Sequence, residues 1–321
     1  MPHKRVLVIA NKSWEATALM NVLLEPKGCP SEFPWPIKLS HPLPPRHDWQ
    51  SPQPRGVFNF QGNVQNKPYE VRVEVWCIQD AMDPSVSPSS TKEKVRVLPK
   101  IFSGMETGVP TSNRPDLVIA LGTACFPGAK SYNGCVFIGT NVFIHDPYKS
   151  NTTHSEYWHS DNTNRLINPP PGSMDFFNPR NTFFDDVLRS QVETRLLSPP
   201  MKPATKPILL ADNNYTAVGV ANITNYDDYA WADLEALEAF KKANRGHQKK
   251  RPVGSLETTH GVIRLQSEAP FLFISGITDR LGQFSMDVGT RPYAQNFVCA
   301  HNTGIVTAWL LPRIVSFLNT L

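Results

Sequence analysis

Two acidic residues, Glu257 and Asp279, stand where the sequence can bring them into one crevice. Ser255, just before Glu257, is typical of an N-cap, so the sequence predicts a helix that begins there with Glu257 in its first turn. Asp279 follows the apolar run Phe271 to Ile274, which predicts a buried strand. A side chain just past such a strand lies at the carboxyl edge of the sheet, where open α/β folds bind ligands. A pair of carboxylates held there predicts a proton donor and an acceptor for hydroxyl groups.

Each acid also has a purely structural interpretation. Aspartate is common in the turn after a strand, so Asp279 could cap that turn. A glutamate in a first helical turn is favoured by the helix dipole, which would account for Glu257. A third acid, Glu15, follows the strand that is predicted at Arg5 to Ala10. It could be an exposed residue of the next helix. The three acids together favour a site over three separate structural roles.

The acidic pairs resemble motifs of the purine nucleoside phosphorylase and methylthioadenosine/adenosylhomocysteine nucleosidase superfamily. In that superfamily a Met-Glu pair near a helix start binds the ribose hydroxyls, and a Ser-Asp or similar pair ending a strand protonates the leaving base. Leu256-Glu257 and Thr278-Asp279 look like these two pairs. The resemblance implies that Glu257, with Leu256 beside it, binds the sugar and that Asp279, with Thr278 beside it, is the acid.

Two further stretches follow in the order that the superfamily has. Val6 to Ile9 and the later Glu15 are similar to its first strand and the acidic residue after it, which implies that Glu15 positions water. Leu121 to Ala124 resembles the glycine turn that touches ribose or phosphate. The resemblance therefore implies that Gly122 and Thr123 contact the substrate.

The chain also departs from the superfamily at two places. Cys125 follows Ala124 where the superfamily usually has another glycine. The loop Asn11 to Trp14 lacks the Gly-Asp-Pro and the arginine that bind phosphate in many phosphorylases, although Lys12 could substitute. The second departure favours water over phosphate as the acceptor of the sugar, whereas the first concerns contacts to the base or the nucleophile.

The predicted function is therefore N-ribosyl hydrolysis of a purine nucleoside or nucleotide. A purine needs an aromatic or apolar wall on which to stack. The tyrosine-rich segment Asn222 to Tyr229 stands where the superfamily places such a wall, and Tyr226 is the expected residue. A phosphate-dependent phosphorylase and a non-catalytic nucleoside-binding or storage protein remain alternatives, because fold does not fix function.

Basic residues crowd the stretch just before Glu257. They are Lys241, Lys242, Arg245, Lys249, Lys250 and Arg251. Runs of like charge are usually solvated. The other interpretation is an electrostatic funnel for a phosphorylated substrate, in which Lys249, Lys250 and Arg251 bind the phosphates. The net charge of +4 is modest for 321 residues and does not indicate a nucleic-acid partner.

No metal or organic cofactor is expected. Residues of metal-ligand types occur at irregular spacing, without an HExxH or paired-cysteine pattern. They are His145, Asp146, His154, Glu156 and His159. His145-Asp146-Pro147 is also similar to a Tyr-His-Asp segment of the superfamily.

Composition favours one globular domain over residues 1–321, with 40% apolar and 19% charged residues. The 30 prolines cluster, and they predict irregular insertions at 26–68 and 150–207, with a third at the basic stretch 241–254. Such insertions are surface loops that can act as lids near a site.

The remaining expectations concern the compartment and the assembly. Five cysteines without a CxxC pair fit a reducing cytoplasm. The apolar run after the first residues is too short for a signal-peptide core, and Gly304 to Leu318 is too short to span a bilayer. No membrane association is expected. The resemblance implies a homo-oligomer.

The elements that must position these residues alternate between strands and helices. Arg5 to Ala10 and Leu117 to Leu121 predict buried strands, and Val71 to Ile78 alternates as a half-exposed strand does. Further strands are predicted at Val136–Ile138, Val142–Ile144, Ile208–Leu210 and Val218–Val220, and helices at Trp14–Leu24, at Tyr229–Lys242 and from Tyr293. This alternation predicts an α/β protein with a mixed sheet flanked by helices. The resemblance implies the three-layer nucleoside-phosphorylase-like fold.

Overall fold

The computed structural model describes most of the chain. The described residues are 3–24, 38–39, 49–64, 67–103, 114–127, 131–147, 158–181, 183–222, 229–244, 253–281, 287 and 291–319. Tyr226, Lys249, Lys250 and Arg251 lie outside these ranges, so their predicted roles stay predictions.

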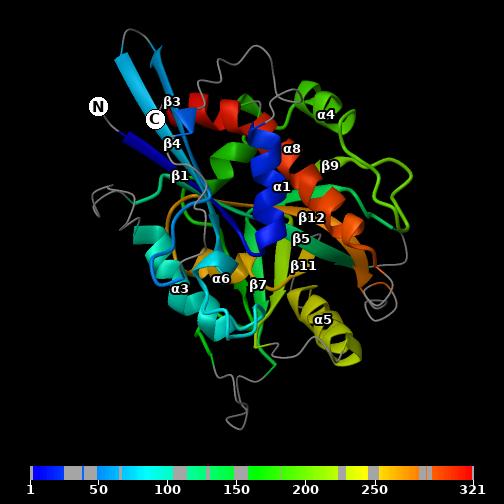
Figure 1. Ribbon diagram of the computed structural model, residues 1–321. Coiled ribbons are helices and arrows are strands. Elements are labelled where there is room, and N and C mark those ends of the chain that lie inside the picture. Colours follow the sequence, from blue (N-terminus) through cyan, green and yellow to red (C-terminus); the bar gives the residue numbers. More distant parts are fainter. Residues whose placement is uncertain are drawn as a thin grey trace.

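One mixed sheet organises the described residues (Figure 1). Its strands are β1 (His3–Ala10), β2 (Lys38–Leu39), β3 (Gly56–Val64), β4 (Lys67–Cys77), β5 (Leu117–Pro127), β6 (Val136–Gly139), β7 (Asn141–His145), β8 (Leu166–Ile167), β9 (Leu209–Ala211), β10 (Thr216–Val220), β11 (Val253–Glu257) and β12 (Phe271–Leu281). The main path runs β2-β3-β4-β1-β5-β11-β10-β7-β8, while β12 pairs with β5 and β6. Strands β1, β4, β5 and β12 are parallel neighbours, so their carboxyl ends share one edge.

Helices cover both faces of this sheet (Figure 1). They are α1 (Ser13–Leu24), α2 (Ile78–Ala81), α3 (Thr91–Ser103), α4 (Asp186–Glu193), α5 (Tyr229–Asn244), α6 (His260–Leu265) and α8 (Tyr293–Leu318), with 3-10 turns η2 (Ser173–Phe177) and η3 (Pro179–Asn181). Alternate residues of β1 explain the layers, because Val8 packs with α1 and α8 whereas Leu7 packs with α3 and α6. The predicted α/β fold, a mixed sheet flanked by helices, is confirmed.

Helix α8 closes the core against α1. A Cβ atom on Gly304 would lie 3.2 Å from the Cα of Leu19 and 3.4 Å from the carbonyl oxygen of Ala18, so glycine permits the close approach of the two helices. The helix also carries buried polar residues, among them Gln295 and Asn302. Within the described part of the chain, no helix has the length and apolar character that a membrane span requires.

The strand predicted at Val71–Ile78 forms as the end of β4, but the prediction that it is half-exposed is wrong. Glu74 has no exposed surface, because Arg5 of β1 donates two hydrogen bonds to its carboxylate, at 3.1 and 2.8 Å. Trp76 adds a third through its indole N–H, at 2.9 Å. The Arg5 partnership holds the pKa of Glu74 below its usual value although burial acts to raise it. A polar residue in the alternating pattern therefore faces a second buried layer rather than solvent.

The proline-rich stretches contain more regular structure than their composition predicts. Strand β3 occupies the end of the stretch 26–68 and pairs with β4. In the stretch 150–207, Phe176, Phe183 and Leu188 join the core beneath α8. In the stretch 241–254, residues 241–244 end α5 and residues 253–254 begin β11.

Candidate active site

Glu257 ends a strand, so the prediction that it heads a helix is wrong. Helix α6 begins three residues later, at His260, behind Thr259. The Oε2 atom of Glu257 accepts hydrogen bonds from the backbone N–H groups of Thr259 and His260, the latter at 2.8 Å. Ser255 is not an N-cap, because its hydroxyl lies in β11 at 2.9 Å from the hydroxyl of Ser275 in β12. The carboxylate is therefore fixed through Oε2, whereas Oε1 has no hydrogen-bond partner among the described residues.

Strand β5 is where the segments that carry Glu257 and Asp279 meet. Leu256 pairs with Cys125 of β5, and Asp279 of β12 is also in register with Cys125. Thr278 reaches the same strand, since its hydroxyl lies 3.2 Å from the carbonyl oxygen of Ala124. Cys125 is thus flanked by Leu256, the residue before Glu257, and by Asp279. The prediction that Asp279 stands just past its strand is wrong, because β12 continues to Leu281. The side chain of Leu256 packs among apolar residues under α5.

Glu15 joins β5 from the first turn of α1. Its Oε1 accepts hydrogen bonds from the backbone N–H and the hydroxyl of Thr123, both at 2.8 Å. Its Oε2 accepts a hydrogen bond from the backbone N–H of Lys12 at 2.9 Å. These contacts join residues 108 positions apart in the sequence. Glu15 is 2% exposed, so it is not an exposed helix glutamate.

Gly122 permits Glu15 and the first residue of α6 to lie close to β5. A Cβ atom at this position would lie 3.3 Å from Glu15 Oε1, 3.5 Å from Glu15 Oε2 and 3.3 Å from His260 Nε2. Glu15 and His260 thus approach one point above the backbone of β5 from different elements. Any side chain on residue 122 would occupy that point.

Asp279 is a buried carboxyl group with a mixed set of neighbours. The guanidinium of Arg291 contacts its Oδ2 atom, and the hydroxyl of Thr278 lies 2.6 Å from the same atom. Oδ1 has no hydrogen-bond partner among the described residues. Burial raises the pKa of Asp279 above its usual value, while the charge of Arg291 opposes part of that rise. A carboxyl group with a raised pKa is suited to hold a proton that it later donates.

Asp287 is a second carboxylate near Asp279 and pairs with two further cations. It contacts Lys202 at 2.8 Å and Arg280 at 3.2 Å. Burial acts to raise the pKa of Asp287, but the hydrogen bonds from Arg280 and Lys202 hold it below its usual value. Asp287 therefore stays ionised, and its negative charge contributes to the raised pKa of Asp279.

Lys94 lies beneath the turn that follows Glu257. Its ammonium group has no exposed surface and donates to the hydroxyls of Thr258 and Thr259, each at 3.1 Å. Thr259 also contributes one of the backbone N–H groups that bind Glu257. Lys94 thus links α3 to the turn that fixes the carboxylate.

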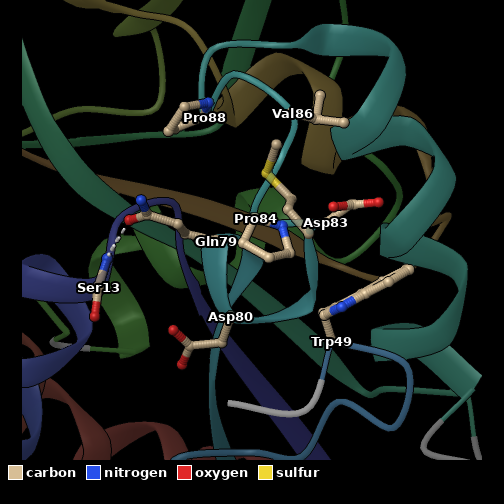
Figure 2. A pocket seen from close by; sticks show the side chains of 9 residues that line it. Ser13, Trp49, Gln79, Asp80, Asp83, Pro84, Val86 and Pro88 are labelled. Atoms are coloured by element: carbon tan, nitrogen blue, oxygen red, sulfur yellow. Dashed lines mark hydrogen bonds between the residues drawn. The ribbon is translucent and has the colours of Figure 1, made fainter.

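A cavity of about 330 Å³ lies beside the start of α1 (Figure 2). Its walls are Ser13, Trp49, Gln79, Asp80, Met82, Asp83, Pro84, Val86 and Pro88. The backbone N–H of Ser13 donates to the Gln79 side chain at 3.0 Å, which ties α1 to α2. The cavity therefore adjoins the helix that carries Glu15, on the side of α2.

The histidines and acids near β7 have partners other than a metal. His145 contacts Glu235 at 2.8 Å and Asn164 at 3.2 Å, and His159 contacts Asp146. Among the described residues, no group of three or more histidine, cysteine and acidic side chains is arranged to hold a metal ion.

Sequence reasoning missed three residues of this region: Lys94, His260 and Arg291. The only signal for His260 was its position three residues after Glu257, and a lone histidine beside apolar residues gives no reason to single it out. Arg291 lies 12 residues after Asp279, and no periodic pattern joins them. Lys94 is one of several lysines on α3, and its burial depends on packing against α6.

Comparison with known proteins finds similarity at the level of solved structures. No protein-family model matches the chain, and no curated protein does. A 5′-methylthioadenosine/S-adenosylhomocysteine nucleosidase from Neisseria meningitidis is 13% identical, with 98% of this chain and 99% of that chain covered and a TM-score of 0.47. One from Borrelia burgdorferi, bound to adenine, is 9% identical, with 94% and 98% covered and a TM-score of 0.48. A futalosine hydrolase mutant from Helicobacter pylori is 9% identical, with 99% and 100% covered and a TM-score of 0.46. The solved structures to which the chain is similar thus include nucleosidases of the superfamily that its motifs resemble.

Proposed function

We propose that this chain is an N-ribosyl hydrolase that cleaves the bond between the base and the ribose of a purine nucleoside or nucleotide. The observation that carries the proposal is the presence of two carboxyl groups in neighbouring segments: Asp279, a buried acid with a raised pKa, and Glu257, whose Oε1 has no hydrogen-bond partner among the described residues. Both belong to segments that meet at Cys125 of β5.

Asp279 is the proposed acid. Breaking a ribosyl carbon–nitrogen bond leaves electron density on the base, so a proton delivered to the base lowers the barrier. The burial that raises the pKa of Asp279 favours the protonated carboxyl group. Its Oδ1 atom lacks a partner among the described residues and can face the leaving base.

Glu257 is the proposed ribose clamp. Oε2 is held by the two backbone N–H groups of the following turn, so the carboxylate plane is fixed before substrate binds. Oε1 then accepts a hydrogen bond from a ribose hydroxyl. Preorganised acceptors of this kind orient the sugar, which places its anomeric carbon between the acid and the nucleophile.

Glu15 is the proposed ligand of the attacking water, with Gly122 and Thr123 beneath it. Thr123 fixes Glu15 from β5, and the lack of a side chain on Gly122 lets the Glu15 carboxylate lie close to that strand. Water is the proposed acceptor because the loop before α1 lacks the phosphate-binding residues of many phosphorylases. A phosphorylase would produce ribose 1-phosphate and would need phosphate for base release.

Three parts of the proposal concern residues or properties beyond the described site. Tyr226 is proposed as the wall for the purine, and Lys249, Lys250 and Arg251 as ligands for substrate phosphates. We also propose that the chain acts as a homo-oligomer in the cytoplasm. Light scattering at micromolar concentration tests the assembly, since a fully active monomer would contradict it.

The test of the function is base release from a panel of purine nucleosides and nucleotides. The chain should release free purine without phosphate, as measured by chromatography, and Asp279→Asn should abolish most of that release. A chain that binds nucleosides but never releases base would be the non-catalytic binding protein instead. Base release that depends strictly on phosphate would identify the phosphorylase.

A further inference from the structure

We propose that His260 is a catalytic residue of this site: it is the general base that takes the proton from the attacking water, which Glu15 holds beside it. The inference rests on the proposed function, because it assigns the nucleophile side of that reaction. It goes beyond it, since neither the sequence motifs nor the acid and clamp roles require a histidine.

The ring of His260 is held in one orientation. It is 2% exposed and stacks on Phe273 with 5.9 Å between the ring centroids and an interplanar angle of 22°. Its Nδ1 atom lies 3.3 Å from the hydroxyl of Ser275 and 3.8 Å from Glu257 Oε1. The Ser275 hydroxyl in turn lies 2.9 Å from that of Ser255. The oxygen atoms near Nδ1 can accept a hydrogen bond, so they favour the tautomer that carries its proton on Nδ1.

The opposite ring nitrogen faces the nucleophile side. His260 Nε2 and Glu15 Oε1 each lie 3.3 Å from the point that a Cβ atom on Gly122 would occupy. With the proton on Nδ1, Nε2 has a lone pair directed at the same space. The two atoms therefore lie no more than twice that distance apart, a separation that one bridging water beside Gly122 can span because no side chain stands between them.

Hydrogen-bond capacity assigns different parts to the two residues. Thr123 donates twice to Oε1 of Glu15, which uses both lone pairs of that atom. Among the described residues, Oε2 receives the N–H of Lys12 alone and keeps a lone pair, and it lies 3.5 Å from the same Cβ position. A water that bridges the two side chains donates one hydrogen to Glu15 Oε2 and the other to His260 Nε2. Its oxygen lone pair then points away from both, toward the sugar.

The reaction balances with these residues alone. The water oxygen forms a bond to the anomeric carbon while the carbon–nitrogen bond breaks, and the electron pair of that bond passes to the base. Asp279 donates its proton to the base, and the water proton passes to His260 Nε2. The resulting imidazolium lies between Glu15 and Glu257, whose carboxylates stabilise its charge. Proton exchange with solvent restores both groups after the products leave.

The test compares His260→Ala and His260→Gln with the unchanged chain. Both variants should lower kcat for base release by at least about a hundredfold, the usual scale for loss of a general base, with KM changed less than about threefold. Glutamine can hold the water through its side-chain oxygen but cannot take its proton, so it should not restore the rate. His301→Ala on α8 is the matched control and should keep the full rate. A rate for His260→Gln near that of the unchanged chain would overturn the assignment.

Rescue by added imidazole distinguishes a general base from a histidine that only supports the fold. The site admits a nucleoside, so imidazole can enter the space that His260→Ala opens, and it should raise kcat of this variant in a saturable way. Imidazole should leave Asp279→Asn unchanged. Lack of rescue in a folded His260→Ala variant would overturn the general-base role while the hydrolase proposal stands. An unchanged chain that releases no purine from any substrate would overturn both.

Discussion

Asp279 and Glu15 are equally buried, at 2% exposure each, yet their surroundings differ. Glu15 receives hydrogen bonds from three protein groups, supplied by Lys12 and Thr123. Asp279 contacts Thr278 and Arg291 through one oxygen and keeps the other without a partner among the described residues. The pKa of Asp279 is raised chiefly by burial. Burial alone therefore does not assign a role, because the donors around each carboxyl group also decide whether it serves as a hydrogen-bond acceptor or as a proton donor.

The largest expected effect comes from removing the proton of Asp279. Asp279→Asn should lower kcat by at least about a hundredfold, because an amide cannot protonate the base. Stability should change little, since the amide matches the carboxyl group in size and needs no charge to be buried. Asp287→Asn, a neighbouring carboxylate change, should lower kcat much less. Near-normal turnover in folded Asp279→Asn would show that Asp279 is not the proton donor.

Glu15→Gln should show the opposite balance of activity and stability. An amide NH₂ group would face the N–H donors of Lys12 or Thr123, and an unpaired buried donor costs about 1–3 kcal/mol. We expect that loss in the free energy of unfolding measured in urea, with a roughly tenfold to hundredfold lower kcat. Thr123→Val removes a single donor and should cost less. If Glu15→Gln is as stable as the unchanged chain, the surroundings of residue 15 do not require a side chain that only accepts hydrogen bonds.

Glu257 offers a third environment, with one oxygen fixed and one free. Glu257→Gln should remain partly active, because its side-chain oxygen can still accept the N–H groups of Thr259 and His260. Glu257→Ala should lose at least about tenfold more, since it leaves those groups unpaired and removes the ribose contact. The unchanged chain should also prefer ribonucleosides over 2′-deoxyribonucleosides. Equal rates on both sugars, with Glu257→Ala unaffected, would contradict the clamp.

Arg291→Met should move the pH dependence of the acid. Removing the guanidinium removes a charge that lowers the pKa of Asp279, so that pKa should rise further. Activity requires protonated Asp279 and falls as pH rises through its pKa, so the alkaline limb of kcat should move up by about one pH unit. Asp279 stabilises the folded chain at acid pH, and that contribution should also be lost at higher pH than before. Arg280→Met, which removes a contact to Asp287 instead, is the control. An alkaline limb that moves down would contradict this account.

The smallest expected effect concerns the basic stretch before β11. Neutralising Lys249, Lys250 and Arg251 should raise KM for a nucleotide a fewfold and leave KM for an uncharged nucleoside unchanged, and added salt should weaken the difference. Steady-state kinetics on the two substrates at two salt concentrations measure this. If KM changes equally for both substrates, these residues do not bind phosphate and are solvated surface residues.

Sequence periodicity predicted the layered fold because it depends on alternating apolar residues. The strands at Arg5–Ala10 and Leu117–Leu121 and the helices at Trp14–Leu24 and Tyr229–Lys242 all form. The failures involve polar residues with buried partners. Ser255 has the pattern of an N-cap but pairs with Ser275 of a distant strand, and Glu74 is buried because Arg5 neutralises it.

The surroundings of the site were less predictable than its acids. Glu15 stood out because it follows the first strand, but its contact with Thr123 depends on the pairing of α1 and β5 across more than a hundred residues. The clustering of Lys94, His260 and Arg291 with the acids depends on tertiary packing, which local sequence patterns do not predict.

Hydrolysis and phosphorolysis are distinguished by the fate of the sugar in ¹⁸O-labelled water that contains phosphate. The unchanged chain should release free purine and ribose that carries one ¹⁸O atom at the anomeric carbon, as read by mass spectrometry. Asp279→Asn should yield at least about a hundredfold less of both products under the same conditions. Unlabelled ribose 1-phosphate, or no purine from any nucleoside or nucleotide, would contradict a hydrolase in which Asp279 supplies the proton and Glu15 holds the water.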